Sequence, residues 1–262
     1  MNFEYAGLTD PGLLRENNED SVALDTAQGV AVLADGMGGY NAGEIASAMA
    51  VTFVKAELSR WLEEAAPQCT VSDIKHAMEA CVVNANQSIY NAANANPQFS
   101  GMGTTIVVGV FGARRVLLAH VGDSRCYLWR QGRLTQLTRD HSLLQEQLDA
   151  GLITPAQAKV ASHKNLVTRA LGVEEGVQVD VMEHTPLLGD VYLMCSDGLS
   201  DMVDDEDLTY LLSARSSLQE RASTLIRAAN GAGGRDNISA ILVSVKAESG
   251  AQGFFSRILR RG

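Results

Sequence analysis

Short apolar runs separated by polar turns recur along the chain and predict β-strands. Two of these runs lead into an aspartate, since Val30–Ala34 stops at Asp35 and Val191–Cys195 stops two residues before Asp197. A turn at residues 112–115 joins two neighbouring runs and favours a β-hairpin. The predicted strands cover residues 30–34, 104–111, 116–120, 124–130, 191–195 and 238–245.

Longer stretches carry apolar residues three or four positions apart, and this spacing predicts amphipathic helices. The first begins near Gly43 and would place Ile45, Met49 and Phe53 on one face. The second would begin after an N-cap at Ser72. The third would end at Asn230-Gly231. The apolar positions are 74, 78, 81, 82, 85 and 89 in the second helix and 218, 222, 225, 226 and 229 in the third.

The order of these elements predicts an α+β fold. Strands joined by hairpins, with helices between the pairs, favour largely antiparallel sheets over a doubly wound parallel sheet. We expect one domain over residues 1–248, in which the polar stretch from Arg139 to Ala170 holds a lid-like insertion. Residues 249–262 would form a short tail, and we interpret its basic end as a chain terminus rather than a membrane anchor.

Composition and charge exclude several classes of protein. The formal net charge of −10 argues against non-specific nucleic-acid binding, which needs a surface rich in Lys and Arg. The four cysteines are scattered without a Cys-x-x-Cys pair, so neither a zinc site nor a disulfide framework is indicated. The chain shows no signal peptide and no apolar stretch of about 18 residues, so we expect a cytoplasmic protein without a membrane span.

Four aspartates lie where apolar runs meet tight turns: Asp35, Asp123, Asp197 and Asp236. A single Asp beside a Gly is most often a turn residue. Several carboxylates gathered at strand ends would repel one another unless some stay protonated or a cation lies between them. Carboxylate oxygens suit Mg²⁺ or Mn²⁺, and the histidines lack the spacing of zinc ligands.

Eight short motifs occur in a fixed order across nearly the whole chain, and they include the four aspartates. In these motifs the chain resembles the metal-dependent serine/threonine protein phosphatases of type 2C, in their bacterial form. The motifs are Arg15-x-x-Asn-Glu-Asp20, Ala34-Asp-Gly-Met-Gly-Gly39, Gly101-Met-Gly-Thr-Thr105, His120-Val-Gly-Asp-Ser-Arg125, Leu137-Thr-Arg-Asp-His-Ser142, Val167-Thr-Arg-Ala-Leu-Gly172, Cys195-Ser-Asp-Gly-Leu-Ser-Asp201 and Gly234-Arg-Asp-Asn-Ile238.

The resemblance implies a four-layer α-β-β-α sandwich of two antiparallel sheets flanked by helices. It also implies hydrolysis of phosphoserine and phosphothreonine by water that two, or three, Mg²⁺ or Mn²⁺ ions activate. The partners it implies are phosphorylated proteins and a bacterial Ser/Thr kinase that the enzyme opposes. We expect a monomer.

The resemblance also assigns roles to single residues. Asp35 would bridge two metal ions, one of which would also bind the Gly36 carbonyl. Asp197 and Asp236 would complete the second metal site, and Asp123 would share a third ion with Asp197. The remaining roles are water-mediated metal contacts for Glu19, Asp20 and Asn237, a grip on the phosphoryl group for Arg15, and a flap over residues 139–165 that begins at Arg139, Asp140 and His141.

One position departs from the pattern of eukaryotic members, in which a His after the first Asp-Gly is assigned as the general acid. The residue here is Met37, which cannot donate a proton. A metal-bound water is the first candidate for protonating the leaving oxygen, and His141 is the second. His120, within a strand-like run, is interpreted as structural.

Two other classes of protein compete with this interpretation. One is a degenerate phosphatase, and the other is a different metal-dependent hydrolase, either a nuclease or a small-molecule phosphatase. A degenerate phosphatase that only binds phosphoproteins should have lost metal ligands, but every motif aspartate is present. A metal-dependent nuclease conflicts with the acidic charge. A small-molecule phosphatase is harder to separate, because aryl phosphates would be hydrolysed in either case.

Overall fold

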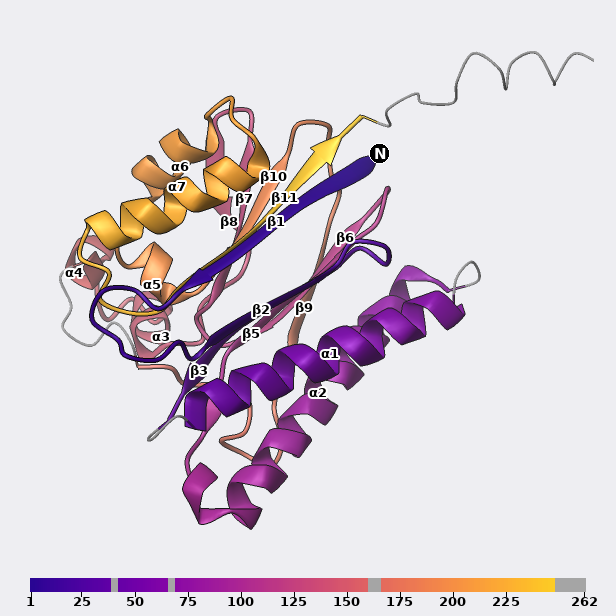
Figure 1. The fold of residues 1–262 in the computed structure, drawn as a ribbon, viewed down its shortest axis with the longest axis vertical. Coiled ribbons are helices and arrows are strands. Elements are labelled where there is room, and N and C mark those ends of the chain that lie inside the picture. The colour runs from indigo at the N-terminus through magenta and orange to yellow at the C-terminus, as the bar shows by residue number, and fades with distance from the viewer. Residues whose placement is uncertain (39–41, 66–68, 160–165, 248–262) are drawn as a thin grey trace, which may run out of the picture.

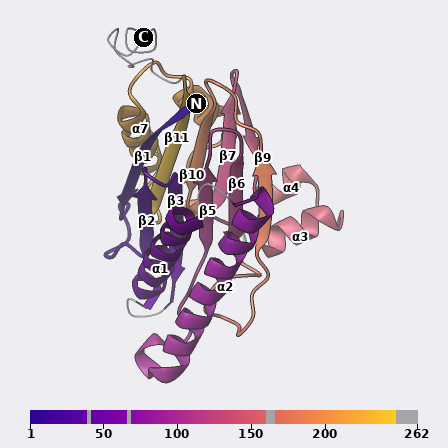
Figure 2. The ribbon, with the colours of Figure 1, turned by 90° about the vertical axis from the view of Figure 1, so that its right-hand side faces the viewer.

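Two antiparallel β-sheets pack face to face, and each carries helices on its outer face (Figures 1 and 2). The computed structural model describes residues 1–38, 42–65, 69–159 and 166–247. This arrangement confirms the predicted α+β sandwich of four layers. The five strands of one sheet, in spatial order, are β1 (Asn2–Asp10), β11 (Ile238–Lys246), β10 (Val191–Cys195), β7 (Arg125–Arg130) and β8 (Arg133–Gln136).

The other sheet begins with an edge strand, β2, that the apolar pattern did not predict. Its order is β2 (Asp20–Asp25), β3 (Val30–Met37), β5 (Ile106–Phe111), β6 (Val116–Val121) and β9 (Asp180–His184), and the short β4 (Gly103–Thr104) pairs with the end of β3. Helices α1 (Ala42–Ala65) and α2 (Val71–Ala95) cover this sheet, whereas α5 (Asp197–Ser200), α6 (Asp205–Leu212) and α7 (Leu218–Gly231) cover the first. The remaining helices are the 3₁₀ turn η1 (Pro97–Phe99), α3 (Leu143–Asp149) and α4 (Pro155–Lys159).

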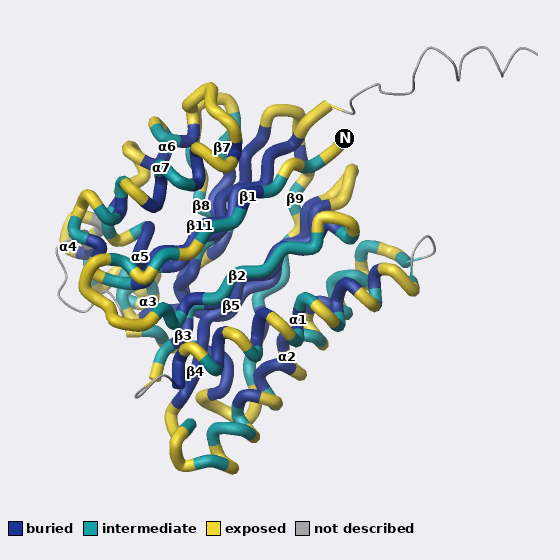
Figure 3. Tube along the Cα trace, in the orientation of Figure 1, coloured by how far each residue is buried: buried dark blue, intermediate teal, exposed yellow. Residues whose placement is uncertain are grey.

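The central strands are apolar on both faces because each sheet lies between two layers. In β3, Val30, Val32 and Ala34 face α1 and α2, whereas Ala31 and Leu33 face the other sheet. This alternation follows from the two-residue period of a strand. Figure 3 shows the result, with buried central strands and a half-buried β2 at the sheet edge. The continuous apolar run therefore stops at Asp35, where the strand reaches the rim of the core.

Helix α1 corrects one sequence prediction. Its fully buried side chains include Ala46, Val54 and Leu58, whereas the predicted face of Ile45, Met49 and Phe53 is only partly buried. Small residues at this contact let the helix approach the sheet closely, so the most apolar stripe is not the most buried one.

Among the helices that the structure describes, none combines the length and the apolar character that a membrane span needs.

Helix α2 also begins differently from the prediction, because its N-cap is Thr70 and not Ser72. The Thr70 hydroxyl accepts from the backbone N–H of Asp73, and the Asp73 carboxylate accepts from that of Thr70. This reciprocal capping box pairs two backbone donors, which a cap at Ser72 would leave to water. The third predicted helix, α7, extends to Gly231 as expected.

Candidate active site

The four predicted aspartates gather at one end of the sandwich, near the start of α1 and α5 (Figure 1). Asp35 lies in the last part of β3, and Asp236 comes two residues before β11. Asp197 is the first residue of α5, directly after β10, and Asp123 follows β6. In an antiparallel pair, one strand ends where its neighbour begins. The end of β10 therefore lies beside the start of β11, and the end of β6 beside the start of β5, which brings the carboxylates at these ends together.

A fifth carboxylate joins them through the sheet register. Asp20, the first residue of β2, pairs directly with Asp35. The Ser196 hydroxyl donates to Asp20 Oδ2 over 2.7 Å, while Asp20 Oδ1 is buried and has no hydrogen-bond partner among the residues that the structure describes. A buried carboxylate oxygen that lacks a partner carries a desolvation cost which a cation would offset.

The aspartate cluster is defined as Asp20, Asp35, Asp123, Asp197 and Asp236. Burial and repulsion between carboxylates disfavour the charged forms of the first four. Burial, followed by the charges of neighbouring carboxylates, raises the pKa of Asp35 and of Asp197 well above the usual range. Burial likewise raises the pKa of Asp20 and of Asp123 to about 6. These four carboxylates therefore take up protons more readily than free aspartates unless positive charge is supplied, and the oxygen donors of the cluster fit hard divalent cations.

Hydroxyl groups and close backbone contacts hold these strand ends together. Thr105 Oγ1 accepts from the Asp35 N–H at 3.1 Å and lies 2.7 Å from the Ser124 hydroxyl. A side chain at Gly36 would place its Cβ 2.1 Å from the Gly43 carbonyl oxygen. Only glycine permits this approach, so the glycine of the Asp35-Gly36 pair is required by packing against α1.

Arg15 lies beside the cluster and forms an ion pair with Asp236, with 2.7 Å between Nη2 and Oδ2. The Arg15 side chain is 52% exposed, so its guanidinium remains open to a ligand. The hydrogen bond to Asp236 raises the pKa of Arg15 further. The geometry thus presents a fixed cation at the edge of the carboxylates, as an anion-binding group requires.

Asn237 supports the loop that carries Arg15. Its side-chain amide donates to the carbonyls of Pro11 and Asn17, and its Oδ1 accepts from the Glu19 N–H. These bonds use both amide donors, so the structure places Asn237 as a positioning residue for the loop. Thr105, Ser124 and Ser196 have supporting positions that the sequence interpretation did not assign, although all three lie within the quoted motifs.

Glu19 connects the same loop to the start of α1. Its carboxylate accepts a backbone hydrogen bond from Gly43, while burial raises its pKa. Its own carbonyl accepts from the Gly36 N–H at 3.1 Å. Glu19 therefore lies next to Gly36 near the end of β3, as the predicted site requires.

The start of the predicted flap is anchored in the fold. Asp140 is buried and accepts three hydrogen bonds from the Arg125 guanidinium. His141 is also buried, and its backbone N–H donates to the Gly122 carbonyl. Asp140 and His141 therefore lie packed in the fold at the start of the predicted flap, while the Arg139 side chain pairs with Asp149 of α3. Residues 160–165 of the predicted flap lie outside the described residues.

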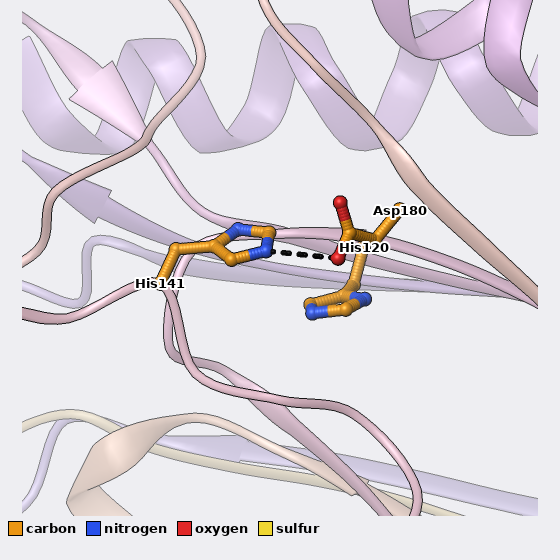
Figure 4. A group of neighbouring side chains, drawn as sticks. All are labelled: His120, His141 and Asp180. Atoms are coloured by element: carbon orange, nitrogen blue, oxygen red, sulfur yellow. Dashed lines mark ion pairs between the residues drawn. The ribbon is translucent and has the colours of Figure 1, made fainter. Parts of the chain in front are cut away.

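His141 belongs to a second polar group, with His120 and Asp180, whose ligand atoms all lie within 4.8 Å of one another (Figure 4). The two imidazole rings stack with centroids 4.7 Å apart. The Gly122 N–H donates to His141 Nδ1, so the ring proton is on Nε2, which faces Asp180. Arg169 Nη1 lies 3.0 Å from Asp180 Oδ1 and already supplies a cation. Stacked rings do not converge on one ion, so we interpret this group as structural.

The contacts of His141 also affect its suitability as the group that protonates the leaving oxygen. Burial lowers the pKa of His141 to about 4, so the ring is neutral near pH 7, and its N–H points to Asp180. His120 is fully buried, in agreement with the structural role inferred for it.

A family model described as protein phosphatase 2C matches residues 15–242. The chain belongs to this family. It is 38% identical over 238 residues to the serine/threonine phosphatase stp of Listeria innocua, which covers 90% of this chain and 93% of the relative. It is therefore a serine/threonine protein phosphatase, a phosphoric monoester hydrolase, as the resemblance predicted.

Solved structures agree with the fold. The serine/threonine phosphatase PstP/Ppp of Mycobacterium tuberculosis superposes with a TM-score of 0.86 at 37% identity, covering 94% of this chain and 100% of the other. The PstP catalytic domain in complex with two manganese ions has a TM-score of 0.82 at 38% identity, covering 94% and 99%. Phosphatases of the family use Mg²⁺ or Mn²⁺.

Proposed function

We propose that the aspartate cluster is the metal centre of the enzyme and binds Mg²⁺ or Mn²⁺. Asp35 and the Gly36 carbonyl would hold one ion, and Asp35, Asp197 and Asp236 would hold a second. Asp123 and Asp197 would hold a third, while Asp20 and Glu19 would act through water. When bound, the ions supply positive charge and an activated water for attack on phosphorus. The observation that carries the proposal is the gathering of buried and half-buried carboxylates near an Asp20 oxygen that has no hydrogen-bond partner among the described residues.

Arg15 would bind the phosphoryl group of the substrate. Its guanidinium is half-exposed and fixed by Asp236 at the edge of the cluster, so a phosphoryl oxygen could be held close to the carboxylate ligands. Met37 provides no proton, and the His141 N–H faces Asp180. The leaving serine or threonine oxygen would therefore take its proton from a water of the site.

The substrates would be phosphorylated proteins modified by a Ser/Thr kinase that this enzyme opposes in the cytoplasm. Residues 1–248 would form the catalytic domain of a monomer, and residues 249–262 a separate tail. Loss of the enzyme should raise phosphothreonine and phosphoserine occupancy at the sites of that kinase. A phosphoproteome that does not change when the gene is deleted would contradict this role.

Calorimetric titration of the metal-free protein with Mn²⁺ tests the ligand set. We expect at least two ions per chain in the unmodified protein and fewer in Asp197→Asn, because the amide supplies less charge to each shared ion. Asp205→Asn, a change at an exposed aspartate of α6, is the matched control and should bind as the unmodified protein does. Equal stoichiometry and affinity in Asp197→Asn would remove Asp197 from the ligand set.

The raised pKa values predict how stability depends on pH. Between about pH 4 and pH 6, folded Asp20 and Asp123 bind protons more tightly than the unfolded chain does. Their stabilising contribution, roughly 3 kcal/mol per group at most, is present at low pH and is lost as the pH rises through about 6. Cations replace these protons, so Mn²⁺ should raise the Tm by ~5 °C or more at about pH 7.5 and by clearly less at about pH 5. Scanning calorimetry with EDTA or Mn²⁺ would contradict this if the two increments were equal.

A further inference from the structure

Two large apolar side chains are exposed directly beside Arg15. Leu13 is 64% exposed and Leu14 is 71% exposed. A single exposed leucine is common on soluble proteins and needs no explanation. An adjacent pair next to the residue proposed to hold the phosphoryl group is a different case, because it exposes apolar area within two positions of that residue.

The loop that carries this pair is firmly held. The N–H groups of Leu13 and Leu14 both donate to the Gly234 carbonyl, at 2.8 and 3.2 Å. A Cβ at Gly12 would lie 2.2 Å from the Asp236 carbonyl oxygen, so the loop lies directly on the segment before β11. With the Arg15–Asp236 ion pair, these contacts fix the leucines relative to the site. A surface that is already ordered loses little entropy when it binds a partner.

We propose that Leu13 and Leu14 form a docking surface for apolar side chains that flank the phosphorylated residue of a protein substrate. The inference rests on the proposed role of Arg15. Residues of an extended peptide follow one another at about 3.3 Å and alternate between its two faces. Leu14 and Leu13 are one and two positions from Arg15, so residues within a few positions of a phosphate at Arg15 are within reach of the two leucines. The enzyme would thus select phosphoproteins with apolar residues beside the phosphothreonine or phosphoserine.

Two phosphothreonine peptides test this selection, one with leucine on both sides of the phosphothreonine and one with glycine. The unmodified enzyme should prefer the leucine peptide, chiefly through a lower KM. In Leu13→Ala/Leu14→Ala the ratio of kcat/KM for the leucine peptide to that for the glycine peptide should fall about tenfold, from the loss of apolar contact area. Leu188→Ala is the matched control, since Leu188 is 59% exposed in the turn between β9 and β10, where Gly189 bonds Val245 at the other end of β11.

An unchanged ratio of kcat/KM in the double variant would overturn the proposal, whether activity on the two peptides stays the same or falls equally. Sedimentation that shows the unmodified chain forming dimers which the double variant does not form would also overturn it, because the leucines would then contact a second copy. A different failure would show in the unmodified enzyme: hydrolysis of neither peptide with Mn²⁺ present would contradict the proposed function itself.

Discussion

Asp35→Asn is expected to lower kcat/KM for a phosphothreonine peptide by at least about 100-fold. Asp35 is proposed to bridge two ions, and a metal ion contributes several kcal/mol to stabilising charge in phosphoryl transfer. Each 1.36 kcal/mol corresponds to a factor of ten in rate, so the loss of one bridging ligand should exceed two such factors. Steady-state kinetics at saturating Mn²⁺ would measure the effect.

The same substitution should not unfold the protein. Asparagine keeps the shape of the side chain and removes a group whose charged form is disfavoured first by burial and then by neighbouring carboxylates, the two causes that raise the pKa of Asp35. The Tm in EDTA should therefore be equal to or above that of the unmodified chain at about pH 7.5. Asp205→Asn serves as the kinetic control. Activity of Asp35→Asn within a factor of about three of the unmodified enzyme would exclude Asp35 as a bridging ligand.

Arg15→Ala is expected to lower kcat/KM on the same peptide by roughly 30-fold or more, with metal stoichiometry unchanged. The guanidinium would form charge-assisted hydrogen bonds to the phosphoryl oxygens that strengthen as the bond to the leaving oxygen breaks. Since Arg15 is half-exposed, its effect should be smaller than that of Asp35. Kinetics together with calorimetric Mn²⁺ titration would separate phosphate binding from metal binding.

Arg15→Lys is the conservative comparison. Lysine keeps the charge but lacks the planar fork, so it should recover only part of the lost activity. Equal kcat/KM in Arg15→Ala and the unmodified enzyme would count against any role in phosphate binding. A loss of bound Mn²⁺ in Arg15→Ala would instead show that the ion pair with Asp236 mainly orders a metal ligand.

The apolar pattern predicted the central strands well because burial on both faces makes their sequences continuously apolar. The edge strands β1, β2, β8 and β9 were missed, because half-buried strands with mixed polar residues have an apolar pattern like that of loops. The face of α1 was misassigned because the buried stripe contains alanines, which contribute little to a hydrophobic pattern. The four-layer order of sheets and helices was predicted from the family resemblance that the motifs carry, and not from the spacing of apolar residues.

The candidate site was also predicted only in part from the sequence. The motifs identified Asp35, Asp123, Asp197 and Asp236, and the fold brings them to one end of the sandwich. The pairing of Asp20 with Asp35 depends on the β2–β3 register, which no local pattern encodes. His141 is buried and forms two hydrogen bonds with Gly122, the residue after β6, and these contacts between distant parts of the chain could not be predicted from local sequence.

The central claim is that hydrolysis depends on divalent cations held by the aspartate cluster. The most direct measurement is phosphate release from a phosphothreonine peptide after full chelation with EDTA and gel filtration, and again after Mn²⁺ is added back. We expect activity to be abolished by chelation and restored by Mn²⁺, with no restoration in Asp35→Asn. Unchanged activity in the chelated, metal-free enzyme would contradict the account.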